Sequence, residues 1–331
     1  MLKKYLLSLS FIGFLIPVLS ICPARAETAG KLYTSARQHN WITVQNLLET
    51  SSFDQEELNN VLGLAVAAEN SEMIELLAEK GADINHLSSW NTPLLINAIM
   101  HDKFTAAKKL VLLGADIQIR GYHREEQNIY LSWDWTPLMC AARQGLLDLA
   151  QTILDKGADI NEIGWSQSRR VPENAADIAA YSGHMDVLQL LLKKGAILSP
   201  NVLHKAVRAG HADIVKFLIT EQRSNVNFLD PVQGKSPLME AAWWGYKDIL
   251  LELIHSGADV NQKGLFGHTS LGEAIRSNNP DSNRQLEIIM LLVENGADIT
   301  DEDNVYLMTP LQLAIEQNRM DAVSFLEENM E

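Results

Sequence analysis

Apolar residues recur along most of this 331-residue chain at the spacing of short amphipathic helices. Between residues 146 and 154 the apolar positions include 146, 149, 150, 153 and 154, and a later segment carries them at 249, 250, 253 and 254. Positions three and four residues apart share one face of an α-helix, so each segment is expected to bury one stripe. With 47% hydrophobic residues and only ten prolines, the pattern predicts a folded, mostly helical chain.

Capping residues mark where the predicted helices begin and end. Thr136-Pro137 places a hydroxyl N-cap before the first helical position, where the missing N–H of proline costs nothing. Gly145 is expected to end this first helix in the left-handed conformation. Gly157 ends a second helix in the same way, and the Asp-x-Asn sequence at 159–161 then opens a turn. The unit that these signals predict is a helix–turn–helix.

The same unit recurs along the chain. Residues 136–142 read Thr-Pro-Leu-Met-Cys-Ala-Ala and residues 236–242 read Ser-Pro-Leu-Met-Glu-Ala-Ala, and both are followed by Gly-Ala-Asp, at 157–159 and 257–259. Gly-Ala-Asp also occurs at 81–83, 114–116 and 296–298. This resembles the ankyrin-repeat consensus, with Thr-Pro-Leu-His near the start and Gly-Ala-Asp near the end, over nearly all of residues 30–331. The resemblance implies an all-α ankyrin-repeat solenoid whose helix–turn–helix repeats are joined by β-hairpin-like turns.

The spacing of these features divides the chain into about nine repeats. The predicted ranges are 30–58, 59–90, 91–134, 135–172, 173–199, 200–233, 234–266, 267–306 and 307–331, and they form one domain over 27–331 with no linker. Three insertions interrupt the regular spacing, at 118–133, at 162–172 and at 278–284. Insertions in a repeat array map to loops, and residues 118–133 are expected to form an enlarged finger.

Residues 1–26 differ from the rest of the chain. Lys3 and Lys4 precede an apolar stretch over 5–21, and Ala24-Arg25-Ala26 places small residues where a signal peptidase reads them. This is the three-part pattern of a secretory signal peptide, which predicts cleavage after Ala26 and a periplasmic or secreted protein. No later segment is long and apolar enough to cross a membrane, so the cleaved chain is expected to be soluble and monomeric, without stable membrane insertion.

Two alternatives exist for this N-terminal segment. It could be a retained membrane anchor, although the apolar run is short for a span and contains Pro17. It could also be a lipoprotein signal, because Leu19–Cys22 resembles a bacterial lipobox, although Ile21 stands where a small residue is needed. Cys140 is the only cysteine after residue 26, so the fold does not depend on a disulfide.

The charge of the chain argues against nucleic acid as a partner. There are 27 basic and 42 acidic residues, a net charge of −15, and removal of residues 1–26 leaves 24 against 42, a net of −18. A polyanion repels a phosphate backbone, and no basic stripe offsets this charge. The simplest role of the charge is to keep a long exposed solenoid in solution, and attraction of basic partners is a second role.

The sequence contains no recognisable catalytic, metal or cofactor motif. His204 matches the histidine of the ankyrin Thr-Pro-Leu-His turn, and His184 and His211 follow the mid-repeat glycine, where hydrogen bonding at a helix start is expected. Cys140 lies beside Ala141 on the packed side of a helix, so a buried inert thiol is expected. The acidic run at 301–304 lacks the glycine and distal glutamate of a calcium loop. We therefore expect no catalytic residue, no metal and no cofactor.

The resemblance to ankyrin proteins points to a protein-binding face instead. In that family, partners lie against the turn tips and the inner face of the first helix, just after the Ala-Ala pair. Aromatic residues and arginine are the types enriched at protein hot spots. The residues of these types at those positions, and thus the predicted partner-binding set, are Trp90, Trp135, Arg143, Tyr181, Arg208, Trp243, Trp244, Phe266, Arg276 and Tyr306. Packing between repeats is the alternative role for any single one of them.

The function that follows is an exported protein–protein interaction module. Its specific form is a periplasmic adaptor or inhibitor, such as an immunity-type protein that neutralises a toxin, binding one protein partner on its concave face. Two other classes stay open: a secreted effector that acts inside a host cell, and an enzyme or small-molecule binder hidden in the array. Ankyrin architecture alone does not identify the partner.

Overall fold

The computed structural model describes residues 23–87, 92–125, 128–166, 171–278, 281–302 and 307–330. Their backbone forms eighteen helices and four short strands, so the predicted helical character is confirmed. The chain has two compact units, which divide between His86 and Leu87. Of the predicted signal peptide, residues 1–22 lie outside the described residues, and 23–26 belong to the first helix. None of the described helices is both long and apolar enough to cross a bilayer.

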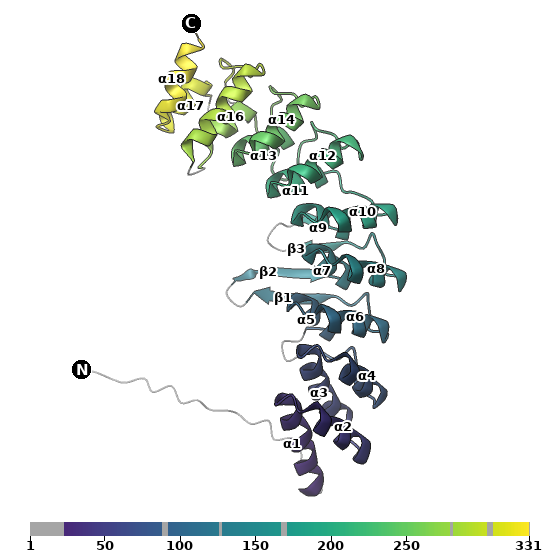
Figure 1. The fold of residues 1–331 in the computed structure, drawn as a ribbon. Coiled ribbons are helices and arrows are strands. Elements are labelled where there is room, and N and C mark those ends of the chain that lie inside the picture. Colours follow the sequence, from purple (N-terminus) through teal and green to yellow (C-terminus); the bar gives the residue numbers. More distant parts are fainter. Residues whose placement is uncertain are drawn as a thin grey trace, which may run out of the picture. The chain divides into compact units, whose positions relative to one another are not determined.

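The N-terminal unit consists of two helix pairs (Figure 1). They are α1 (Pro23–Arg37) with α2 (Trp41–Thr50), and α3 (Gln55–Ala67) with α4 (Ser71–Glu79). The start of α3 has a capping box, in which the Asp54 carboxylate accepts from the Glu57 backbone N–H and the Glu57 side chain accepts from the Asp54 N–H. Leu62 of α3 and Ile74 and Leu77 of α4 are fully buried and belong to the core of this unit.

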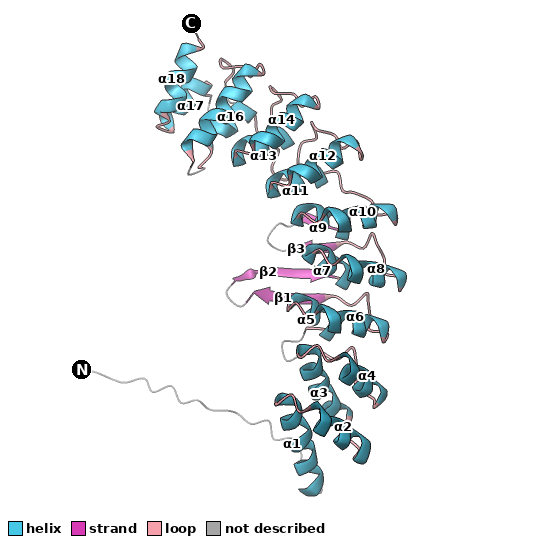
Figure 2. Cartoon of the chain, in the orientation of Figure 1, coloured by secondary structure: helices cyan, strands magenta, loops and turns pink. Residues whose placement is uncertain are grey.

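The second unit continues with helix pairs stacked in two layers, shown in Figure 2. First helices contact first helices from α5 to α17, and second helices pack on second helices at α6–α8, α8–α10, α12–α14 and α16–α18. The first helices are α5 (Leu94–Met100), α7 (Pro137–Gln144), α9 (Ala175–Ser182), α11 (Val202–Ala209), α13 (Pro237–Trp244), α15 (Ser270–Arg276) and α17 (Pro310–Glu316). The second helices are α6 (Phe104–Leu112), α8 (Leu147–Asp155), α10 (Met185–Lys193), α12 (Ala212–Thr220), α14 (Lys247–His255), α16 (Ser282–Glu294) and α18 (Met320–Glu328).

The capping signals act as predicted. The Thr136 hydroxyl accepts a hydrogen bond from the Met139 N–H, and Ser236 caps α13 in the same way. Gly145 ends α7 with a φ of 70°, in the left-handed region. It also has no room for a side chain, because a Cβ there would lie 2.5 Å from Nδ1 of His184 in the next repeat. His184 donates a hydrogen bond from Nε2 to the Arg143 carbonyl, and His211 donates one from Nε2 to the Tyr181 carbonyl. Both histidines therefore have the hydrogen-bonding role that was predicted.

The two central insertions form a single four-stranded antiparallel sheet. Residues 118–133 contribute β1 (Gly121–Glu125) and most of β2 (Asn128–Trp135), and residues 162–172 contribute β3 (Gly164–Ser166) and part of β4 (Val171–Glu173). The strand order is β1-β2-β3-β4, and Trp133 and Asp134 of β2 are paired with Ser166 and Trp165 of β3. The sequence predicted an enlarged finger at 118–133, and the structure shows in addition that it pairs with the neighbouring insertion.

Close packing and one arginine hold the base of this sheet together. A Cβ on Gly164 would lie 2.7 Å from the Asp134 carbonyl oxygen, so only glycine allows β3 to approach β2 here. Arg120, just before β1, donates from Nη1 to Asp134 Oδ2 at 2.8 Å and also pairs with Glu162. The sheet therefore joins two successive repeats across their turns.

The third predicted insertion is partly helical. Residues 278–284 were expected to form a loop between the helices of the eighth repeat, but residues 282–284 are the first turn of α16. Asp281 is the N-cap, and its side chain accepts from the Arg284 N–H. The added residues thus lengthen α16 to thirteen residues. The predicted repeat boundaries themselves stay a prediction.

Candidate protein-binding face

The predicted binding residues occupy equivalent positions on the first helices. Arg143, Tyr181, Arg208, Trp243 and Arg276 come from α7, α9, α11, α13 and α15, and these helices pack against one another in that order. All five side chains are half-buried, as expected for a surface row between packed helices. Trp244, next to Trp243, and Phe266, in the turn before α15, are more exposed. Trp90 and Tyr306 lie outside the described residues.

A buried carboxylate organises two of these residues. Arg208 Nη2 donates to Glu240 Oε1 at 2.7 Å, and Trp244 Nε1 donates to Glu240 Oε2 at 3.2 Å. Only 4% of the Glu240 side chain is exposed, compared with 27% for Arg208 and 43% for Trp244. The acid is therefore beneath the surface, and the guanidinium and indole groups that it orients are at the surface.

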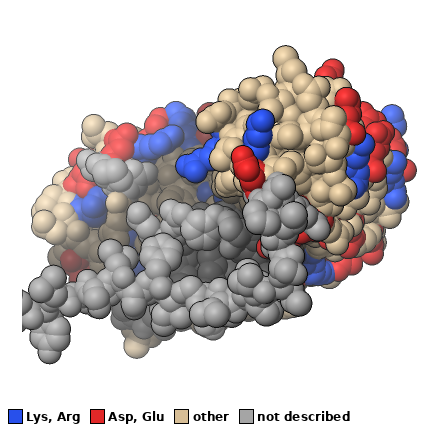
Figure 3. Space-filling view, turned by 90° about the horizontal axis from the view of Figure 1, so that it is seen from below, with Lys and Arg blue, Asp and Glu red and all other residues tan. Residues whose placement is uncertain are grey.

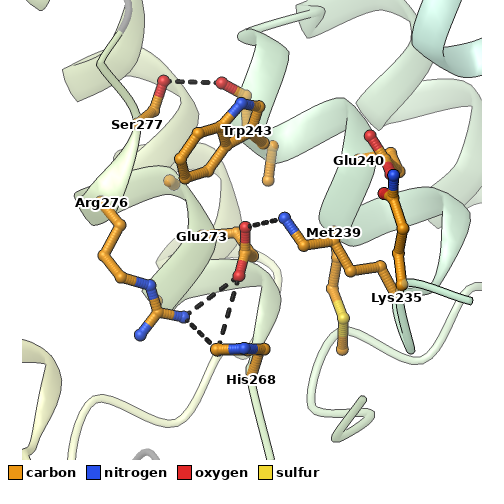
Figure 4. Close-up of polar contacts among 12 residues, drawn as sticks. Lys235, Met239, Glu240, Trp243, His268, Glu273, Arg276 and Ser277 are labelled. Carbon is orange, nitrogen blue, oxygen red and sulfur yellow. Dashed lines mark hydrogen bonds and ion pairs between the residues drawn. The ribbon is translucent and has the colours of Figure 1, made fainter. Parts of the chain in front are cut away.

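A second carboxylate organises the next step of the row, drawn in Figure 4. Glu273 accepts from Lys235 Nζ at 2.5 Å and from Arg276 Nη2 at 3.1 Å, and Arg276 Nη2 also lies 2.8 Å from Nδ1 of His268. The same Lys235 Nζ lies 4.7 Å from the centroid of the Trp243 ring, a cation–π distance. The Trp243 backbone carbonyl accepts from Ser277. Trp243 is thereby held between two repeats.

A third buried cluster lies between α9 and α11. Lys205 Nζ is 2.8 Å from Asp177 Oδ2 and 3.6 Å from Glu173 Oε1, and all three side chains are at most 8% exposed. Lys205 occupies the slot that Cys140 fills on α7 and that Glu240 and Glu273 fill on α13 and α15. Lys235, Glu240 and Glu273 are not among the residues predicted from the sequence. The sequence signal that could have revealed these residues is a charged residue directly after Pro-Leu-Met, as at Glu240, where the helix pattern predicts a buried position.

Two of the predicted contacts are corrected by burial. Trp135 is 3% exposed, because its ring lies against Gly164 of the neighbouring strand β3, and its side chain is unavailable to a partner. The guanidinium carbon of Arg143 lies 5.6 Å from the centroid of the Trp135 ring. The Arg276 side chain is 11% exposed and is bound to Glu273 and His268, so its role is to hold the turn. Tyr181, Arg208, Trp243, Trp244 and Phe266 keep exposed or half-buried surface.

The described residues offer little acid–base or metal chemistry. Burial raises the pKa of the Cys140 thiol to about 12, and Arg143 offsets only part of this rise, so the thiol stays protonated. Burial also lowers the pKa of His204, whose Nε2 donates to the Lys235 carbonyl at 2.9 Å. In the described part of the chain no three His, Cys, Asp or Glu side chains come together as a metal site.

The surface charge is mixed where it can be seen. Lys and Arg side chains are interspersed with Asp and Glu over the visible surface in Figure 3. On this described part of the face neither sign forms a continuous stripe.

Comparison with known proteins identifies the repeats. A family model described as ankyrin repeats (3 copies) matches residues 176–264, and one described as ankyrin repeats (many copies) matches residues 138–192. The ankyrin repeat and KH domain-containing protein mask-1 of Caenorhabditis elegans is 26% identical over 240 residues, which is 71% of this chain and 8% of that protein. The human transient receptor potential cation channel subfamily A member 1 is 25% identical over 309 residues, 89% of this chain and 27% of the channel.

A third relative is more similar over a shorter stretch. Alpha-latrotoxin-Lg1a of Latrodectus geometricus is 33% identical over 131 residues, which cover 40% of this chain and 9% of the toxin. The chain thus spans less than a third of the length of each of these three relatives. Ankyrin repeats are generally binding modules for proteins and not enzymes. The matches place ankyrin repeats within residues 138–264, and together with the capped helix pairs and their two-layer stacking they fit an all-α ankyrin-repeat solenoid fold.

Proposed function

We propose that this protein is an exported adaptor or inhibitor that binds one protein partner along the first-helix layer of residues 87–331. The observation that carries the proposal is the row formed by Tyr181, Arg208, Trp243 and Trp244 on three successive first helices. Aromatic rings offer large apolar area at low entropic cost, and arginine adds a directional charge. The buried Glu240 carboxylate holds both Arg208 and Trp244, which reduces the conformational entropy that they would lose on binding.

The row is tested by partner capture with a double variant. Tyr181→Ala combined with Trp244→Ala is expected to weaken capture of the periplasmic partner by about thirtyfold, or about 2 kcal/mol, because both rings lose their contact area. Capture from a periplasmic extract followed by titration of the eluted protein provides the measurement. Leu147→Ala is the matched control, since Leu147 is similarly exposed but lies on α8 in the second-helix layer. Wild-type affinity in a double variant of unchanged helicity and melting would exclude this row as the binding site.

Export is the other half of the proposal. The signal pattern of residues 3–26 supports a periplasmic or secreted protein, and an immunity-type inhibitor of an incoming toxin is the form that we favour. We expect the intact mass of the exported protein to correspond to a chain that begins at Glu27. A chain that begins at Cys22 and carries a diacylglycerol mass would contradict this expectation and assign a membrane-anchored lipoprotein.

A further inference from the structure

The contacts of Arg208 indicate the chemistry of the partner. This inference rests on the proposed protein-binding function. Arg208 makes two side-chain hydrogen bonds to described residues, and both leave from Nη2, to Glu240 Oε1 and to Gln233 Oε1 at 2.7 Å. A guanidinium has five N–H donors in a planar fork. The Nε and Nη1 groups of Arg208 take no part in these bonds, and more than a quarter of the side chain is exposed.

The acids around this arginine are buried and already engaged. Glu240 binds Arg208 with one oxygen and the Trp244 indole with the other. Asp230, at the start of the neighbouring turn, is buried, and its Oδ1 accepts from the backbone N–H groups of Val232 and Gln233 at 2.7 and 2.9 Å. Of the Arg208–Glu240 pair, the cation is the partner that reaches the surface, and Glu240 balances its charge from beneath.

Exposed apolar side chains border the Gln233 side of Arg208. Val232 precedes Gln233 and is exposed, and so are Leu265 and Phe266 in the next turn. The two turns touch, because the Leu265 N–H donates to the Gly234 carbonyl at 2.8 Å and a Cβ on Gly234 would lie 2.9 Å from Cβ of Leu265. Trp244 shares the Glu240 carboxylate with Arg208, and Val232 adjoins Gln233, the other partner of Arg208. We call Arg208, Val232, Trp244, Leu265 and Phe266 the Arg208 patch.

We propose that the Arg208 patch binds an extended acidic segment of the partner protein. A carboxylate of that segment would accept a charge-assisted hydrogen bond from Nη1 of Arg208. Neighbouring apolar residues of the segment would pack on Trp244 on one side and on Val232, Leu265 and Phe266 on the other. Glu240 is a positioning residue, because it orients both Arg208 and Trp244 and is itself too buried to touch the partner.

Selection from a library of short random peptides displayed on phage tests the proposal on the purified full chain. We expect the enriched peptides to combine Asp or Glu with aromatic or aliphatic residues, and to bind more weakly as salt concentration rises. Enriched peptides that are basic, or the absence of any enrichment, would overturn the acidic segment. If the enriched peptides are basic but their binding is still lost in the Tyr181→Ala, Trp244→Ala variant, the acidic segment is wrong and the proposed binding row still stands.

Variants then locate the binding to Arg208. Arg208→Gln alone leaves Glu240 buried without its cation and risks unfolding, so the decisive variant is Arg208→Gln with Glu240→Gln. This pair keeps the net charge of the chain and leaves two neutral side chains that can still hydrogen-bond. Titration of a synthetic enriched acidic peptide, followed by fluorescence anisotropy, should show about a tenfold or greater loss of affinity in this folded double variant.

A matched control separates the local contact from general charge. Lys247 lies on α14 of the same helix pair as Trp244, and it is paired with Glu287 in the second-helix layer. The double variant Lys247→Gln with Glu287→Gln should bind the acidic peptide with unchanged affinity. Equal loss in both double variants, or no loss in the Arg208 variant, would overturn the assignment of Arg208 as the anchor.

Discussion

Replacement of Lys205 with methionine is expected to lower the free energy of unfolding by about 3–5 kcal/mol, the largest effect that we predict for a single change. The substitution removes the cation that lies 2.8 Å from Asp177 and 3.6 Å from Glu173, and both carboxylates are almost completely buried. Two like charges would then remain close together without water or a counter-ion. Denaturant unfolding monitored by circular dichroism measures the change.

The same substitution at an exposed ion pair provides the control. Lys247 pairs with Glu287 on the second-helix layer, and both side chains are almost half exposed. Because water already screens this pair, Lys247→Met should leave the midpoint of unfolding unchanged within error. Equal losses of stability in the two variants would show that the Lys205 cluster is not a buried ion pair in solution.

The second large effect is expected in the core between repeats. Leu191→Ala should lower the free energy of unfolding by about 2–5 kcal/mol, because Leu191 is fully buried on α10, which packs on α8 and α9. Lost apolar burial and an unfilled cavity both contribute to this loss. Repeats are stabilised mainly by their neighbours, so damage at a central interface should broaden the unfolding transition of the second unit.

An exposed position on the same helix tests whether the apolar face is assigned correctly. Gln189→Ala lies two residues from Leu191 but on the exposed side of α10. Its effect should be within about 0.5 kcal/mol of zero, as for most surface substitutions. A Leu191→Ala change as small as that of Gln189→Ala would mean that the second helices bury a different stripe.

Local signals explain why most of the fold could be predicted. A Thr-Pro or Ser-Pro start and a glycine stop act within a single helix, so the start and end of α7 and α13 could be read directly from the sequence. Recurrence of the unit then implied stacking, since one helix pair cannot bury its apolar face alone. The binding row followed from the same alignment of repeats, because Tyr181, Arg208 and Trp243 hold equivalent positions.

Contacts between residues distant in sequence explain what could not be predicted. Pairing of β2 with β3 joins two insertions whose strand residues, Trp133 and Ser166, lie in different repeats. Burial of Trp135 depends on that pairing. Arg208 reaches Glu240 across 32 positions and Lys235 reaches Glu273 across 38, so no local pattern revealed that buried carboxylates hold the face together.

The shared sheet makes its two hairpins interdependent in evolution and in design. β2 and β3 are interior strands only because each covers the other, and β1 and β4 form the edges. Deletion of either hairpin would uncover a strand of the other, with its row of unpaired N–H and carbonyl groups open to pairing with another chain. The two loops therefore form one module: a graft of the finger onto another repeat protein, or its loss from this one, should succeed only when both hairpins are moved or removed together.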